Sequence, residues 1–206
     1  MTIHDFSIDI ETLSTAKNAV VLSIGAVYVN TIKRHGSIID FPHEFYKVIR
    51  INDQLNHGRH IDYDTLAWWL KRDEKVRNVT FEGMPGAPEA VTLDQALYDL
   101  KAWTLYISKG EDRNFWAKGV GFDGAIIESA FTGPGKMLDH PTFPFRGWQE
   151  VRTLERLSGV SVQDQNKRDH PYLHQVCEEW KHHALYDARY QGAFVADELM
   201  HGFDHV

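Results

Sequence analysis

The first fifty residues alternate short apolar runs with polar loops, a pattern that is typical of β-strands. Residues 3–10 carry four apolar side chains, and residues 20–30 form an almost continuous apolar run. Short runs of this kind, rich in Val and Ile, indicate buried strands. Residues 37–50 alternate more loosely and predict a third strand, antiparallel to the second, in which Pro42 requires an edge or a bulge. Between the second and third strands we expect a turn at residues 31–36.

From residue 62 the apolar period lengthens to between three and four, which is typical of helices. The first helix is predicted by four apolar residues at helical spacing: Leu66, Trp69, Leu70 and Val76. Asp62 or Asp64 would cap this helix, and Trp68 lies off its apolar face. Thr92 and Gln95 form a capping box that begins a second helix.

Strands and helices alternate through the rest of the chain. A short strand at 114–119 leads into a helix that starts near residue 122, and a fifth strand is predicted at 145–149. Residues 160–172 are polar, so we expect a surface loop there before a last amphipathic helix at 183–200. Strands that come first and alternate with helices afterwards predict one α/β domain with a mixed sheet.

Composition limits the classes of function that are open to this chain. Its 206 residues, 43% of them hydrophobic, suffice for one well-packed domain. The formal charge of −7 argues against a broad basic surface for long duplex nucleic acid, but it leaves room for a narrow site. Cys177 is the single cysteine, which excludes a disulfide framework and a multi-cysteine zinc site. The sequence has no apolar run of transmembrane length and no signal-peptide pattern, so we expect a cytosolic protein without membrane contact.

Two acids at the end of the first predicted strand form the first candidate site. Asp9 and Glu11 are two residues apart, so on a strand their carboxylates point to the same face. Like charges this close raise each other's pKa unless a positive charge lies between them. Mg²⁺ or Mn²⁺ would supply that charge and prefers carboxylate oxygens. A solvated strand end with two unrelated acids is the alternative.

Two further acids occupy places where the predicted helices begin. Asp123 lies at a strand-to-helix turn between Gly121 and Gly124, where a simple N-cap would also place an acid. Asp187 lies in the first turns of the last helix, where a polar residue is ordinary. Neither acid is decisive by itself.

Taken in order, the four acids and a histidine shortly before the last of them resemble the DEDD exonucleases, in the subgroup that has a catalytic histidine. The resemblance runs from Asp9 to about Leu199. Several neighbouring segments are similar, more narrowly, to exonuclease-VIII-like and phage-encoded 3′-5′ exonucleases. These segments are Asp9-Ile10-Glu11-Thr12, Leu22-Ser23-Ile24-Gly25-Ala26, Trp68-Trp69-Leu70, Trp116-Ala117-Lys118-Gly119 with Phe122-Asp123, Val151-Arg152-Thr153-Leu154 and His182-His183-Ala184-Leu185.

The resemblance implies a ribonuclease-H-like fold, with a five-stranded mixed sheet flanked by helices, in one exonuclease domain over residues 1–206. It also implies two divalent cations, Mg²⁺ or Mn²⁺, with Asp9 bridging both. Glu11 and Asp187 would hold the cation that carries the nucleophilic water, and Asp123 would hold the other. Two such cations stabilise the attacking and the leaving oxygen of a phosphodiester together.

The substrate implied by the resemblance is the 3′ end of a single-stranded nucleic acid. We favour DNA, because the resemblance suggests a phage or prophage enzyme acting in the host cytoplasm. An exoribonuclease with the same site is the first alternative, since discrimination depends on contacts with the 2′-hydroxyl. A catalytically inactive nucleic-acid-binding module is the second, and protein partners stay unknown.

Two adjacent histidines compete for the role of general base. His183 and Asp187 are four residues apart and share a face of a regular helix, so helix geometry alone favours His183. The family spacing implies His182 instead, in the looser segment before the helix. We choose His182, which near neutral pH can take a proton from the attacking water.

Four residues are candidates for contact with the substrate. The resemblance implies that Thr12 and Leu13 meet the terminal sugar and separate the bases, although a core position is the alternative for Leu13. Trp116 offers an aromatic face on which a base could stack. Many relatives carry an asparagine where this chain has Lys118 and Gly119; Lys118 would either reach a phosphate or stay solvated.

Overall fold

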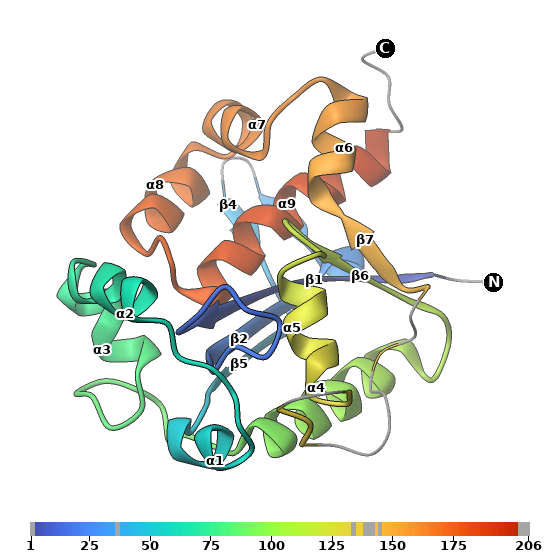
Figure 1. The fold of residues 1–206 in the computed structure, drawn as a ribbon. Coiled ribbons are helices and arrows are strands. Elements are labelled where there is room, and N and C mark those ends of the chain that lie inside the picture. The colour runs from blue at the N-terminus through green and yellow to red at the C-terminus, as the bar shows by residue number, and fades with distance from the viewer. Residues whose placement is uncertain (1–2, 36–37, 133–134, 138–142, 144–145, 202–206) are drawn as a thin grey trace.

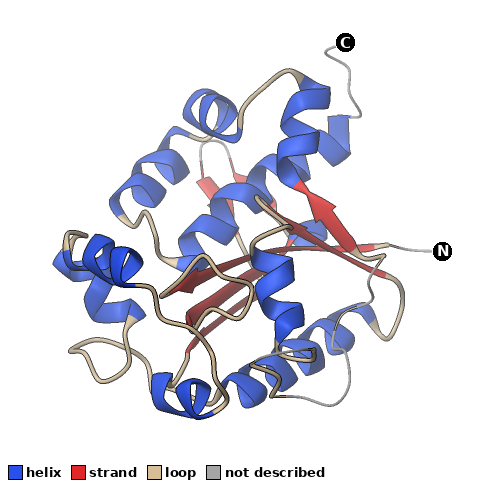
Figure 2. Ribbon diagram, in the orientation of Figure 1, coloured by secondary structure: helices blue, strands red, loops and turns tan. Residues whose placement is uncertain are grey.

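A five-stranded sheet organises the chain (Figures 1 and 2). The structure is a computed structural model that describes residues 3–35, 38–132, 135–137, 143 and 146–201. Across the sheet the strands are β5 (Glu44–Val48), β2 (Val21–Tyr28), β1 (His4–Thr12), β6 (Arg113–Ala117) and β7 (Trp148–Glu150). The central strand β1 pairs antiparallel with β2 and parallel with β6, and β2 pairs antiparallel with β5. The sheet is therefore mixed, as the sequence pattern predicts, and its five strands agree with the ribonuclease-H-like fold that the resemblance implies.

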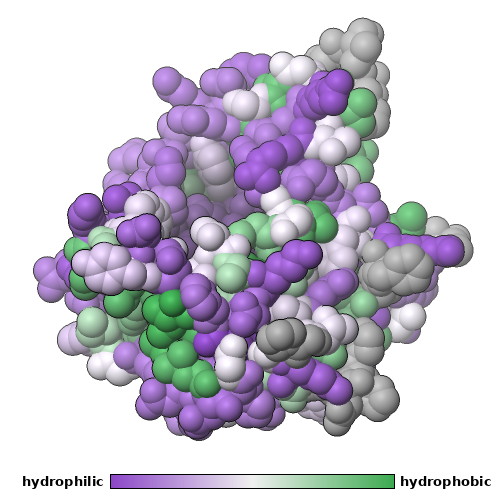
Figure 3. All heavy atoms as spheres, in the orientation of Figure 1, coloured by the Kyte–Doolittle hydropathy of each residue, from purple (hydrophilic) through white to green (hydrophobic). Residues whose placement is uncertain are grey.

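Helices cover both faces of the sheet (Figure 1). The core on one face is shared with α4 (Leu93–Ser108) and α5 (Asp123–Ser129). The other face carries α6 (Val151–Ser158), α7 (Val162–Asp169), α8 (Pro171–Glu179) and α9 (Ala184–His201). The end to which β1 points is closed by α1 (Ile51–Asn56), α2 (Tyr63–Leu70) and α3 (Glu74–Thr80). The surface seen in Figure 3 is mainly hydrophilic, with a group of hydrophobic side chains between α1 and α2. In the described part of the chain, no helix combines the length and the apolarity needed to cross a membrane.

Alternation along β1 decides which of its side chains face which layer. Three apolar residues of β1 lie in the core shared with α4 and α5: Phe6, Ile8 and Ile10. Side chains two residues apart on a strand share a face, so Ser7, Asp9 and Glu11 point to the opposite face, where α9 packs. The side chain of Gln191 on α9 reaches Asp9 there. The period of two therefore turns both acids of β1 toward the helix that carries Asp187.

Two predicted helix starts are confirmed by their caps. The side chain of Asp62 accepts a hydrogen bond from the N–H of Thr65, and Thr92 Oγ1 accepts one from the N–H of Gln95. The single helix expected after Asp62 is two helices, however. The side chain of Asp73 accepts from the N–H of Lys75 and begins α3, a second N-cap signal within the same apolar stripe.

The polar stretch at 160–172 is not a surface loop, as the sequence indicated, but holds α7 and the start of α8. Ser161 caps α7, and the helix turns polar residues inward. The buried side chains of Gln165 and Asn166 donate to the Asp197 carboxylate and the Tyr190 carbonyl of α9. A helix that packs through amides has no apolar period, which is why the sequence pattern missed it.

Smaller differences occur around Pro42 and at residues 31–36. The predicted turn is a 3-10 turn at Val29–Thr31 followed by β3 (Lys33–His35), and β3 pairs with β4 (Ile38–Asp40) in a separate hairpin. The strand predicted at 37–50 is two strands, β4 and β5, which Pro42 separates because it lacks an N–H for pairing. The fifth predicted strand is β7; of the range 145–149, Phe145 lies outside the described residues.

Gly25 lets α9 approach the sheet at the level of the acids. It lies on β2 directly opposite Asp9, and a Cβ there would collide with the main chain of Ala184 and Leu185 at the start of α9. The colliding atoms belong to backbone, which cannot rotate away. Contact between β2 and the start of α9 therefore depends on the missing side chain.

We expect Gly25→Ala to destabilise the protein by about 1–3 kcal/mol, the usual range for overpacking, because the first turn of α9 must move. Urea unfolding measures the change. Gly121→Ala is the matched control, since a Cβ at this position meets no atom within 4 Å. A Gly25→Ala variant as stable as the Gly121→Ala variant would show that α9 adjusts freely.

Candidate active site

The four predicted acids converge at the end of β1, although they come from three separate parts of the chain. Asp9 and Glu11 lie on β1, Asp123 is the first residue of α5, and Asp187 lies in the first turn of α9. Asp123 is not an N-cap: its Oδ1 accepts a 3.4 Å hydrogen bond from the N–H of Ile10, 113 residues away. This hydrogen bond joins the start of α5 to β1 at Ile10, the residue between Asp9 and Glu11.

Burial and mutual repulsion raise the pKa values of these acids. Burial first, and then the charges of Asp187, Asp123 and Glu11, raise the pKa of Asp9 well above its usual range. Burial and the charges of Asp187 and Asp123 do the same to the pKa of Glu11. Burial also raises the pKa of Asp123 and of Asp187 to about 7. Without a compensating cation, ionising all four carboxylates is therefore unfavourable.

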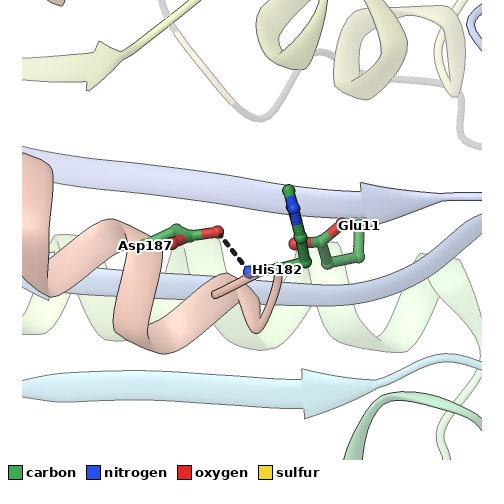
Figure 4. Close-up of side chains that lie close together, drawn as sticks. All are labelled: Glu11, His182 and Asp187. Carbon is green, nitrogen blue, oxygen red and sulfur yellow. Dashed lines mark hydrogen bonds between the residues drawn. The ribbon is translucent and has the colours of Figure 1, made fainter. Parts of the chain in front are cut away.

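This donor set fits divalent cations. One ligand atom each of Glu11, His182 and Asp187 lies within 4.8 Å of the other two (Figure 4). Carboxylate oxygens are the ligands that Mg²⁺ and Mn²⁺ prefer, and a cation between them would remove the repulsion that raises their pKa. The arrangement therefore matches the requirement for metal that the sequence predicts.

The structure separates the two histidines. The helix α9 begins at Ala184, and His182 precedes it in a left-handed conformation (φ 69°). This conformation is held by Asp187, whose Oδ2 accepts a 3.0 Å hydrogen bond from the N–H of His182 (Figure 4). It turns the ring of His182 toward Glu11, at the edge of the acidic cluster.

His183 points away from the acids and is only 6% exposed. Its ring stacks on Tyr46 at 4.4 Å, and its Nδ1 accepts from the N–H of Leu185. Burial lowers the pKa of His183 to about 4, so this ring stays neutral. The helix-face argument for His183 does not apply, because His183 lies before the first residue of the helix.

Two of the four predicted substrate contacts are not brought to the acids. Leu13 is buried beside Leu22 and Trp69. Trp116 is buried as well, and its Nε1 donates to Asp5. Leu13 is therefore a core residue, which is the alternative that the sequence left open. The ring of Trp116 has no exposed face on which a base could stack.

The other two predicted contacts line two hollows that the acids also line. Thr12 lines a hollow of about 440 Å³ together with Glu11, Trp68 and Phe122. Lys118 lines one of about 410 Å³. That second hollow is also lined by Asp9, Arg152, Lys181, His182, Asp187 and Gln191. The first hollow thus holds aromatic rings among threonines and acids, and the second combines cations with the acids.

Sequence reasoning assigned no role to two residues of this site. Trp68 lies edge-on to the ring of His182, with centroids 4.7 Å apart; its place off the apolar stripe of its helix was the available signal. Gln191 donates to Asp9 Oδ1 at 3.0 Å, and no pattern in the sequence marks it.

Comparisons with known proteins agree with this geometry. A family model described as the 3′-5′ exoribonuclease Rv2179c-like domain matches residues 4–199. No curated protein sequence matches the chain. The narrower resemblance to exonuclease-VIII-like and phage-encoded enzymes finds no support, since the matching model is a different one.

Solved structures share the fold at low sequence identity. Cell-death related nuclease 4 (CRN-4) superposes with a TM-score of 0.56 at 13% identity, over 97% of this chain and 64% of that one. The nuclease domain of 3′hExo, a DEDDh family member bound to rAMP, gives 0.54 at 12%, over 98% and 94%. Pop2p of S. pombe, in its Mg²⁺- and Mn²⁺-bound form, gives 0.50 at 11%, over 98% and 85%. The chain thus spans just under two thirds of the length of CRN-4.

The family model covers residues 4–199, nearly the whole chain. The chain therefore belongs to the family of the 3′-5′ exoribonuclease Rv2179c-like domain and carries a hydrolase domain of the 3′-5′ exonuclease class.

Proposed function

We propose that the protein is a metal-dependent exonuclease that removes mononucleotides from the 3′ end of single-stranded RNA. The observation that carries the proposal is the group of four acids, Asp9, Glu11, Asp123 and Asp187, which act on one another electrostatically, with the ring of His182 beside Glu11 and Asp187. A binding module would have no use for four buried or half-buried carboxylates that repel one another.

RNA replaces the DNA that the sequence favoured. The description of the matching family names an exoribonuclease, and the 3′hExo structure contains rAMP. The preference for DNA rested on a phage role, and that basis no longer stands. Single-stranded DNA stays the second candidate, to be decided by the experiment below.

Asp9 would bridge two divalent cations, Mg²⁺ or Mn²⁺, with Glu11 and Asp187 on one and Asp123 on the other. When bound, the two cations supply the positive charge that stabilises both the attacking and the leaving oxygen of a phosphodiester. His182 takes the proton of the attacking water on a ring nitrogen. Its half-buried position lowers its pKa below the usual 6.5, so the ring is neutral and able to accept a proton at pH 7.

The two hollows would bind the parts of the substrate on the two sides of the scissile phosphodiester bond. The first, lined by Thr12 and by the rings of Trp68 and Phe122, suits a nucleoside, because a base can stack on an aromatic ring. On the other side Lys118 and Arg152 offer positive charge for phosphate oxygens. The side chain of Arg152 is 60% exposed, so it can turn toward a substrate, whereas Lys118 is bound to Glu155 at 2.7 Å.

The test is digestion of 5′-labelled RNA and DNA of one sequence, as single strands and as duplexes, with Mg²⁺, with Mn²⁺ and with excess EDTA. We expect a ladder that shortens from the 3′ end of single-stranded RNA, no reaction in EDTA, and recovery when either cation is restored. Faster digestion of DNA would transfer the proposal to deoxyribonuclease activity. Full activity in EDTA would contradict the metal mechanism itself.

A further inference from the structure

One amide on α9 joins the elements that carry the acids. Gln191 is 7% exposed. Its Nε2 donates to Asp9 Oδ1 at 3.0 Å on β1, and its Oε1 accepts from the N–H of Lys118 at 3.0 Å where β6 ends. Since Gln191 lies four residues after Asp187, both side chains leave the same face of α9.

The orientation of this amide follows from its partners. The N–H of Lys118 can only donate, so it must meet the carbonyl oxygen of Gln191. The amide nitrogen of Gln191 then has to face Asp9, whose carboxylate accepts. Neither bond can be exchanged by rotating the amide, because a rotated amide would set donor against donor and oxygen against oxygen.

The close approach of α9 to β1 makes this bridge possible. At the adjacent Gly192 a Cβ would lie 2.7 Å from Val27 and 3.2 Å from Ser7. Helix and strand are thus near enough for one short amide side chain to reach across. The hydrogen bond from Gln191 then fixes the position of Asp9 Oδ1. The orientation of the whole carboxylate, and so of its free lone pairs, is fixed with it.

We propose that Gln191 is a positioning residue that holds the carboxylate of Asp9 in the rotamer needed for metal binding; the inference rests on the metal-dependent function proposed above. Through Lys118 it also fixes the end of β6, from which the chain turns to Asp123. Groups that orient metal ligands in this way typically contribute about 10- to 100-fold in metal affinity.

The experiment is calorimetric titration of Mn²⁺ into the wild type, Gln191→Met and Gln191→Ala, each without substrate. Met keeps most of the volume of Gln but neither hydrogen bond, and Ala removes both the bonds and the volume. We expect the dissociation constant for Mn²⁺ to rise about 10- to 100-fold in both variants. In kinetics, kcat at low Mn²⁺ should fall and recover at high Mn²⁺, while KM for the oligonucleotide stays unchanged.

Gln165→Met is the matched control. Gln165 is a buried glutamine that also bonds to a carboxylate of α9, at Asp197, but not to the acidic cluster, so its loss should leave Mn²⁺ affinity unchanged. Affinity within twofold of the wild type in both Gln191 variants would overturn the inference, as would loss of the fold in both. A wild type that binds no Mn²⁺ would instead defeat the proposed function, so the two failures are distinguishable.

Discussion

Asp9→Asn is expected to remove exonuclease activity by at least about 10³-fold, equivalent to about 4 kcal/mol of transition-state stabilisation. The substitution keeps the shape of the side chain and an oxygen that can accept from Gln191, and it removes the charge. Asp9 is the acid on which the charges of the other three act together, so a cation held by the cluster depends on it most. Initial rates at saturating substrate and Mn²⁺ measure the loss.

Asp9→Asn should lower activity but raise the stability of the metal-free protein. This combination is expected of a residue that holds a metal ion. Repulsion at Asp9 opposes folding in the absence of metal, so the metal-free Asp9→Asn protein should be more stable than the wild type. Mn²⁺ at a hundred times its dissociation constant should stabilise the wild type by about 2.7 kcal/mol and the variant by much less. Thermal unfolding with and without Mn²⁺ measures both effects.

Asp5→Asn is the control for these measurements. Asp5 is a third acid on the same face of β1 and is buried, but its carboxylate accepts from Trp116 and Asn114 and not from the site. It should keep the rate and the stabilisation by Mn²⁺. An Asp9→Asn enzyme that retains a tenth of the wild-type rate would remove Asp9 from its central role.

His182→Ala is expected to lower kcat by about 10²- to 10⁴-fold, the usual contribution of a general base, with KM nearly unchanged. The sign of the pH dependence follows from the pKa. Burial, and then the charges of Lys181 and Arg72, lower the pKa of His182 below 6.5. A base acts when neutral, so the wild-type rate should be at its plateau at pH 7 and fall only as the pH drops through that lowered value. The acidic limb should be absent from the His182→Ala profile.

His183→Ala provides the comparison at the adjacent position. Its ring packs on Tyr46 and Tyr186 and lies outside the cluster. Its loss should lower stability by about 1–3 kcal/mol and leave the pH profile as in the wild type. A variant pair with the reverse behaviour, in which His183→Ala is inactive and His182→Ala is not, would return the role of base to His183.

The sequence alone determined the features of the fold and the site that depend on residues close together in the chain. A period of two on β1 placed Asp9 and Glu11 on one face, and the capping residues Asp62 and Thr92 marked the starts of their helices. These features are local, because strand alternation and N-caps involve residues only two or three positions apart. Local order therefore indicated Asp9 and Glu11 as a pair, whereas Asp123 and Asp187 became candidates only through the family resemblance. The mixed sheet followed from the order of the elements.

The tertiary structure decided whatever depends on residues far apart in the chain. The separation of His182 from His183 depends on a left-handed residue held by Asp187, which a helical period cannot express. The burial of Leu13 and Trp116 depends on packing with distant elements. The bridge at Gln191 joins residues 73 and 182 positions away. The sequence pattern reflects the period of a helix or a strand, which involves neighbouring residues only. Contacts between residues 70 or more positions apart form only when the helices pack on the sheet.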